Sequence, residues 1–151
     1  MRPDRDRLFE LLDQFNIETP SWGYADTGTR FGKFLQPAAA STIQEKLADA
    51  GIVHKHTACC PSVAVHVLWD FSLGVDAQQT ARLAQQHGVR IGAINPNFFQ
   101  DQVYKFGSVC SPDERAQKHA HRHMMESISI AKAVGSNVLS LWFADGSNYP
   151  G

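Results

Sequence analysis

The stretch SVAVHVLW (62–69) decides the fold, because a short run rich in β-branched residues is typical of a buried strand. A second apolar run, VRIGAIN (89–95), follows it. Between the two, Asp76 with Gln79 predicts a helix N-terminus, and Gly88 is suited to follow the last turn. A strand, a helix and a strand at this spacing predict a βαβ unit with parallel strands.

The same alternation extends in both directions along the chain. Before the first run, a capping box predicts another helix, and either Ser41 with Gln44 or Thr42 with Glu45 fits it. After the second run, residues 111–114 (SPDE) combine a cap, a proline and a reciprocal glutamate, which predicts the start of a long helix.

Two further segments complete the pattern. Gly135 ends the long helix, and NVLSLWF (137–143) then predicts a third strand. At the N-terminal side, residues 3–16 predict a short amphipathic helix, and residues 17–40 a long loop rich in aromatic side chains. We therefore expect an N-terminal region over 1–40, followed by strands and helices over 41–151.

This order fits an open doubly wound sheet or a (β/α)₈ barrel. No GxGxxG or GxxxxGK[ST] motif follows the first expected strand, which counts against a dinucleotide or P-loop site. Polar residues follow all three expected strands, as in barrel active sites: His66 and Asp70, Asn95 and Asn97, and Asp145, Ser147 and Asn148. The pattern favours the barrel. Because a barrel needs about 250 residues, we expect a truncated N-terminal part of one with about three strands.

Composition gives no reason to expect several classes of partner. The net charge of −1 gives no electrostatic reason to expect nucleic acid or an anionic membrane. No apolar run approaches the length of a membrane span, and the charged opening MRPDRDRLFE is unlike a signal peptide. The three cysteines fit neither a disulfide framework nor a CxxC metal site. We expect a cytoplasmic protein with reduced thiols.

Candidate site residues lie at the ends of the expected strands. His66 can bind a substrate hydroxyl or move a proton near neutral pH, or it can be a structural histidine. Trp142 can be core or an apolar platform for the C–H face of a sugar. Asp145 can bind hydroxyls or cap its turn, and Asn97 is a further candidate to contact substrate.

The segment HAHRH (119–123) places His119 and His123 at i, i+4, where both could reach one metal ion. No glutamate follows the first histidine as in HExxH, and an outer helix of a barrel lies away from its active site. The favoured interpretation is a solvated helix face, so no metal ligand is predicted in this chain.

Several segments together resemble the bacterial L-rhamnose isomerase family with relaxed sugar specificity, in the xylose isomerase-like barrel superfamily. The specific parts are PSWGYADTGTRF (20–31) and WFADGSNYPG (142–151), with PSVAVHVLWD (61–70) and INPNFFQDQVYKFGS (94–108) between them. The resemblance runs in order over about residues 8 to 151.

This resemblance implies an aldose–ketose isomerase, usually a homotetramer, in which a divalent metal such as Mn²⁺ assists a hydride shift. It also implies that His66 and Trp142 contact the sugar, and that Phe31 reaches into a neighbouring subunit's pocket. The metal ligands of the family come from later strands, so this chain is expected to lack the metal site and to be inactive alone. A sugar epimerase on the same barrel, and a non-catalytic subunit that pairs with a partner chain, remain as alternatives.

Overall fold

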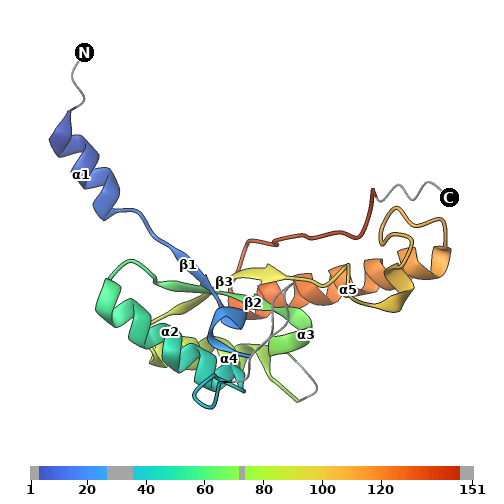
Figure 1. The fold of residues 1–151 in the computed structure, drawn as a ribbon, viewed down its shortest axis with the longest axis horizontal. Coiled ribbons are helices and arrows are strands. Elements are labelled where there is room, and N and C mark those ends of the chain that lie inside the picture. The colour runs from blue at the N-terminus through green and yellow to red at the C-terminus, as the bar shows by residue number, and fades with distance from the viewer. Residues whose placement is uncertain (1–3, 27–35, 72–73, 147–151) are drawn as a thin grey trace.

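The structure is a computed structural model that describes residues 4–26, 36–71 and 74–146. Its centre is a three-stranded parallel sheet in the order β1-β2-β3 (Figure 1). The strands are β1 (Glu18–Pro20), β2 (Ser62–His66) and β3 (Arg90–Asn95). β3 confirms the strand expected over 89–95, whereas the run expected as a strand over 62–69 is extended only as far as His66 and continues as a helix. The two strands pair in parallel, as predicted.

Helices connect and flank these strands. They are α1 (Arg5–Asp13), α2 (Ile43–Thr57), α3 (Val67–Asp70), α4 (Ala77–Gln86) and α5 (Glu114–Val134), with 3₁₀ helices η1 (Ser21–Tyr24) and η2 (Gln102–Tyr104). None of these helices is both long enough and apolar enough to cross a membrane. In Figure 1, α1 projects away from the sheet, and none of its residues is buried against the described chain.

The helix ends show which capping signals operate. At α2 the capping box is Thr42 with Glu45: Glu45 N donates to Thr42 Oγ1 over 3.2 Å, and Thr42 N donates to Glu45 Oε2 over 3.0 Å. At α5 the N-cap is Asp113 rather than Ser111, which instead accepts a hydrogen bond from Asp113 N. The prediction that Gly135 ends α5 is confirmed, because this glycine adopts the left-handed conformation, with a φ of +77°.

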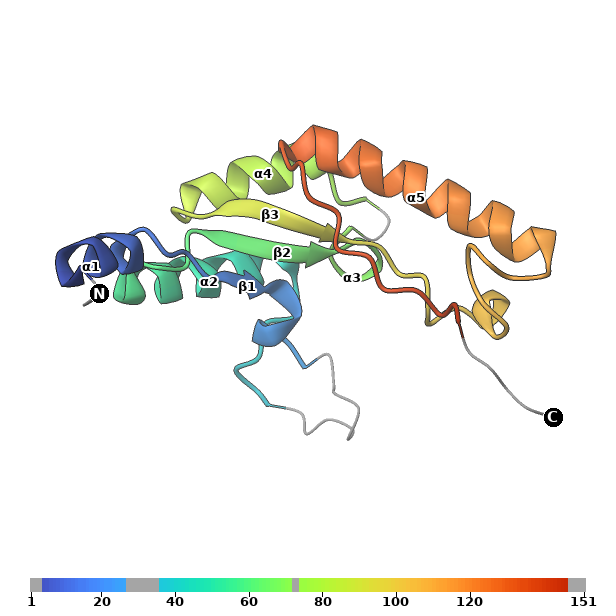
Figure 2. The same ribbon diagram turned by 90° about the horizontal axis from the view of Figure 1, so that it is seen from above.

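One hydrophobic core joins β2 and β3 to α2, α4 and α5. Figure 2 shows α4 and α5 lying along the same side of the sheet. Their core members combine with those of α2 and both strands, among them Leu47, Val63, Val65, Ala84, Ile94 and Ala131. Because side chains alternate along a strand, His66 points to the opposite face from Val63 and Val65. The helices therefore pack one face, and the candidate histidine belongs to the other.

The prediction that the chain forms the first part of a (β/α)₈ barrel is wrong. The described chain forms a small α/β fold around an open sheet. The run 137–143, expected as the third strand, instead makes two isolated bridges, one from Leu139 to Ile94 in β3 and one from Phe143 to Phe98 in the turn after it. Alternating helices and strands predict parallel βαβ units, but closure depends on the number and stagger of strands, which local patterns do not encode.

A further strand was hidden in the region expected to be an irregular loop. β1 pairs with β2 through Glu18, Thr19 and Pro20, which face Ser62, Val63 and Ala64. Three residues ending in proline give no periodic signal, and proline is tolerated in a strand at a sheet edge. Its pairing partner lies more than forty residues later in the sequence, so the strand forms through tertiary contact.

Gly51 tests how closely α2 packs on the end of α4. A Cβ added at Gly51 would lie 2.4 Å from the backbone oxygen of His87. A backbone carbonyl cannot swing aside as a side chain can, so Gly51→Ala is expected to lower the free energy of unfolding by about 1–2 kcal/mol, despite the helical preference of alanine. Urea unfolding measures this. Gly23→Ala is the control, because its Cβ would meet Pro20 Cγ at an ordinary 3.4 Å; equal losses in the two variants would contradict the packing argument.

Candidate functional site

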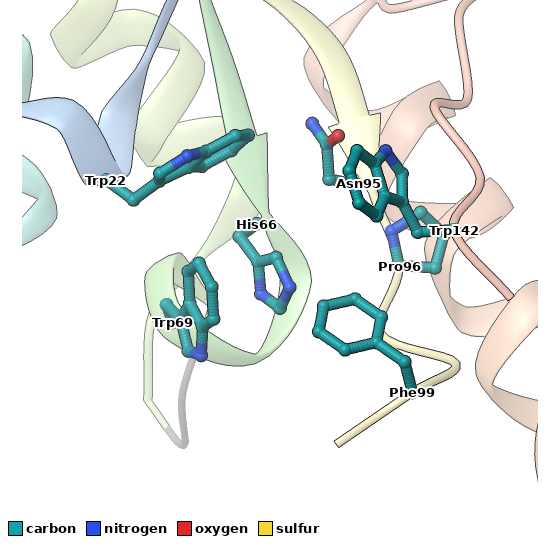
Figure 3. A pocket seen from close by; sticks show the side chains of 7 residues that line it. All are labelled: Trp22, His66, Trp69, Asn95, Pro96, Phe99 and Trp142. Carbon is teal, nitrogen blue, oxygen red and sulfur yellow. The ribbon is translucent and has the colours of Figure 1, made fainter. Parts of the chain in front are cut away.

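A cavity of about 180 Å³ opens at the carboxyl ends of β2 and β3 (Figure 3). Four segments build it: η1, the end of β2 with α3, the end of β3 with the turn after it, and the chain beyond α5. Its lining is mainly aromatic and consists of Trp22, His66, Trp69, Asn95, Pro96, Phe99 and Trp142. Because the strands are parallel, their carboxyl ends meet at this edge, which brings the segments together.

His66 and Trp69 form the inner wall of the cavity. After His66 the chain leaves the sheet and makes one helical turn, α3, so residues 66 and 69 come to lie on the same side. Their rings stack with centroids 3.6 Å apart and an interplanar angle of 13°. Trp22 meets His66 edge-on at 6.2 Å and 85°. Figure 3 shows the imidazole between these two indoles and Phe99.

The imidazole of His66 is neutral at physiological pH. His66 is only 3% exposed, and burial lowers the pKa of its imidazole to about 4, because desolvation disfavours the charged form. The negative charge of Asp70 acts in the opposite direction, while His123 and Lys46 lower the pKa further. Burial outweighs the favourable charge, so His66 acts as a neutral hydrogen-bonding group.

His66 has hydrogen-bonding capacity that its surroundings do not use. Its Nε2 lies 3.5 Å from Asn97 Nδ2, at the outer limit for a hydrogen bond. Its Nδ1 is buried and has no partner among the described residues. A buried polar atom without a partner costs about 1–3 kcal/mol, so this nitrogen calls for an explanation, and a ligand in the cavity would supply one.

A buried ion pair lies behind the inner wall. Lys46 Nζ donates to Asp70 Oδ1 over 2.7 Å, and the two side chains are 5% and 0% exposed. The other carboxylate oxygen, Oδ2, accepts from Ser21 Oγ and from the backbone N–H of His66. This group joins α2, η1 and the junction of β2 with α3.

Asn97 lies in the turn that follows β3 and supports the cavity without lining it. Its Oδ1 accepts hydrogen bonds from the backbone N–H groups of Phe99 and Gln100, which fixes the turn that carries Phe99. Its own backbone N–H donates to His123 Nε2 over 2.9 Å. Asn97 is 2% exposed, and its contact with the cavity passes through His66 and Phe99.

Two of the side chains that line the cavity, Trp142 and Asn95, have groups that a ligand could contact directly. Trp142 is 70% exposed, so it does not belong to the core of the described chain, and its ring lies 6.5 Å from that of Phe99. Asn95 donates through Nδ2 to the backbone oxygen of Val65 over 3.1 Å. Within the described ranges nothing donates to its Oδ1, so this oxygen is left as an acceptor at the cavity wall.

Asp145 lies apart from the cavity and organises a loop. Its carboxylate accepts hydrogen bonds from Ser108 Oγ, Ser108 N and Cys110 N. Burial acts to raise the pKa of Asp145, but these hydrogen bonds and one from Val109 N outweigh it and lower the pKa below the usual value. The structure thus brings together His66, Trp142 and Asn97 but not Asp145; Phe31, Ser147 and Asn148 lie outside the described residues.

The HAHRH segment is only partly a solvated helix face. His121 is exposed, but His123 is 7% exposed and packs edge-on against Phe98 at 5.4 Å. Burial lowers the pKa of His123. His119 is turned to Asp101, with its Nε2 3.5 Å from Asp101 Oδ2. The interpretation as a solvated face is therefore wrong for His123, which serves as a buried acceptor for Asn97 N.

The sequence prediction missed three residues that line the cavity, Trp22, Trp69 and Phe99. It also missed Lys46, which lies in the buried ion pair behind the inner wall. The sequence predicted a loop rich in aromatic side chains over residues 17–40, but it did not predict that Trp22 points into a cavity with His66. Trp69 was expected in an extended strand, which would place it away from His66. All three tryptophans of the chain, Trp22, Trp69 and Trp142, line this one cavity, and that count was visible in the sequence.

No family model matches the chain. It is 34% identical over 155 residues to a probable sugar isomerase of Rhizobium meliloti, covering 98% of this chain and 35% of that protein. It is 33% identical over 151 residues to a probable sugar isomerase of Mesorhizobium japonicum, with 97% and 34% coverage. The chain is similar to sugar isomerases. It spans about a third of the length of these curated relatives. The likeness supports the expected general class, a sugar isomerase, and carries no information on L-rhamnose in particular.

Proposed function

We propose that this chain forms the aromatic side of a sugar-binding pocket in an aldose–ketose isomerase, with L-rhamnose and L-rhamnulose as the substrate type. The observation that carries the proposal is a neutral, incompletely hydrogen-bonded imidazole held among aromatic rings in one cavity. The likeness to probable sugar isomerases supports the reaction class. L-rhamnose as the preferred sugar rests on the resemblance of sequence segments.

A sugar needs two kinds of contact, and the cavity offers both. Its C–H faces pack on flat apolar rings, and Trp142 presents such a ring with most of its surface open. Its hydroxyl groups need donors and acceptors, which His66 and the Oδ1 of Asn95 supply. Because the imidazole is neutral, it can both donate and accept a hydrogen bond, which suits a hydroxyl group better than a charged ring does.

A divalent metal such as Mn²⁺ would polarise the open-chain sugar for the hydride shift of this reaction class. The residues that the structure describes do not fit such an ion. Nowhere in 4–26, 36–71 or 74–146 do three His, Cys, Asp or Glu side chains come together in a group that could hold a metal. We therefore assign sugar binding to these residues and derive no step at a metal. The proposal also includes a homotetramer in which Phe31 reaches into the pocket of a neighbouring subunit. Both points rest only on the resemblance to the L-rhamnose isomerase family.

Tryptophan fluorescence tests the proposal, because every tryptophan of the chain lines the cavity. Titration of the chain with L-rhamnose or L-rhamnulose is expected to give a saturable change. Trp142→Ala should weaken binding about 3–10-fold through the loss of one ring contact, with little change in stability since Trp142 is exposed. His66→Phe should keep the stacking on Trp69 and weaken binding by a similar factor, because the hydrogen bonds are lost.

Phe106→Ala is the matched control. Phe106 is a 66% exposed aromatic residue that is not among those lining the cavity, so its replacement should leave the titration unchanged. The proposal fails if neither sugar gives a saturable signal, or if Phe106→Ala weakens binding as much as Trp142→Ala. A polyol without a carbonyl group, such as mannitol, separates general polyol binding from preference for the substrate pair.

A further inference from the structure

The carboxylate of Asp70 divides its two oxygens between two tasks. Oδ2 accepts hydrogen bonds from Ser21 Oγ over 2.5 Å and from His66 N over 2.7 Å. Among the described residues, the donor to Oδ1 is Lys46 Nζ, over 2.7 Å. All of this is buried: Ser21, Lys46 and Asp70 are 0%, 4% and 2% exposed. A buried ion pair of this kind is often no more stabilising than apolar residues of the same size, so its geometry calls for another explanation.

The two donors to Oδ2 belong to segments that carry cavity rings. Ser21 directly precedes Trp22, His66 supplies its own backbone N–H, and Trp69 directly precedes Asp70. The three rings are in mutual contact, with Trp22 lying 6.0 Å from Trp69 and 6.2 Å from His66. Asp70 Oδ2 therefore binds His66 itself and Ser21, the residue next to Trp22, while Asp70 is the residue next to Trp69. In this way one oxygen atom connects the three elements that carry these rings, η1, β2 and α3.

From this geometry we infer that Asp70 is a positioning residue, whose carboxylate fixes Trp22, His66 and Trp69 relative to one another and thereby sets the affinity of the cavity. This positioning role is argued from the contacts of Asp70 and does not depend on the proposed function. Only the identity of the ligand, a sugar, rests on the proposed function. Lys46 enables this role, because it gives the second oxygen a donor and compensates the buried charge.

Two variants separate the acceptor from the charge. Asp70→Ala removes both acceptors, whereas the double variant Asp70→Asn with Lys46→Gln keeps a side-chain oxygen for Ser21 and His66 and lets the two amides pair in place of the ions. Near-UV circular dichroism reports the packing of the three tryptophans without any ligand. We expect Asp70→Ala to lose most of this signal and to weaken L-rhamnose binding about tenfold or more. The double variant should regain both.

Thr80→Val is the matched control, because it removes a buried side-chain hydrogen bond away from the cavity. Thr80 lies on α4, is 3% exposed, and donates through Oγ1 to the backbone oxygen of Asp76, the N-cap of that helix. The variant should lower stability and leave the near-UV signal unchanged. If Asp70→Ala does not fold, Ser21→Ala serves in its place. It removes only the hydrogen bond from Ser21 Oγ to Asp70 Oδ2 and should change the near-UV spectrum by a smaller amount.

The outcomes are distinct. A folded Asp70→Ala or Ser21→Ala variant with the near-UV spectrum of the parent overturns the positioning role, whatever its stability. A double variant that regains stability but not the spectrum also overturns it. If the parent chain binds neither L-rhamnose nor L-rhamnulose, the proposed function fails, while the spectra still decide the role of Asp70.

Discussion

Lys46→Met is expected to lower the free energy of unfolding by about 3–5 kcal/mol, because it leaves the carboxylate of Asp70 buried without its counter-charge. Lys46 Nζ is the partner of Asp70 Oδ1 at 2.7 Å, and neither side chain is more than 5% exposed. The methionine fills a similar volume, so the loss reports the charge rather than a cavity. Urea unfolding followed by far-UV circular dichroism measures it.

The control is Lys118→Met, which breaks an ion pair of similar length on the surface. Lys118 Nζ lies 2.9 Å from Glu114 Oε2, but the side chains are 74% and 79% exposed. Solvent screening reduces such a pair to about 0.3–0.5 kcal/mol. Adding Asp70→Asn to Lys46→Met should recover much of the loss, because it removes the unpaired charge. Equal losses for Lys46→Met and Lys118→Met would refute a buried pair.

Much of the fold follows from local signals. Asp76 caps α4 through Gln79 N, and Gly135 ends α5 in the left-handed conformation, because both effects are decided within a few residues. The barrel was wrong for the opposite reason. Sheet closure is set by pairing between distant strands, and the run 137–143 has the composition of a strand but makes only isolated bridges within the described chain.

The site shows the same division between local and distant causes. His66 was predicted because the end of a parallel strand is a favoured position for ligand contacts, and it does lie in the cavity. The burial of Lys46 was not predictable from its own helix, where a lysine normally faces water. It depends on Asp70, 24 residues later in the sequence. Trp69 was missed because the turn of α3 places it over His66, and no capping signal in the sequence marks that turn.

The two buried histidines make the chain sensitive to mild acid. Burial is the main cause that lowers the pKa of His66 to about 4 and also lowers the pKa of His123. In the unfolded chain a histidine titrates near pH 6.5, so below that pH the unfolded state binds more protons than the folded state. Stability from this source is therefore fully present above about pH 6.5 and is lost progressively as the pH falls toward 4.

The expected result is a urea midpoint that decreases steadily between about pH 7 and 4.5, a window chosen because most carboxylates titrate below it. His66→Phe should flatten part of this decrease, because the phenyl ring can stack on Trp69 and takes up no proton. His121→Phe should leave the slope as it is, since His121 is exposed on the same helix as His123. If the urea midpoint of His66→Phe falls with pH as steeply as that of the parent, His66 is protonated as easily in the folded as in the unfolded chain. The argument for sugar binding, which rests on a neutral imidazole, would then fail as well.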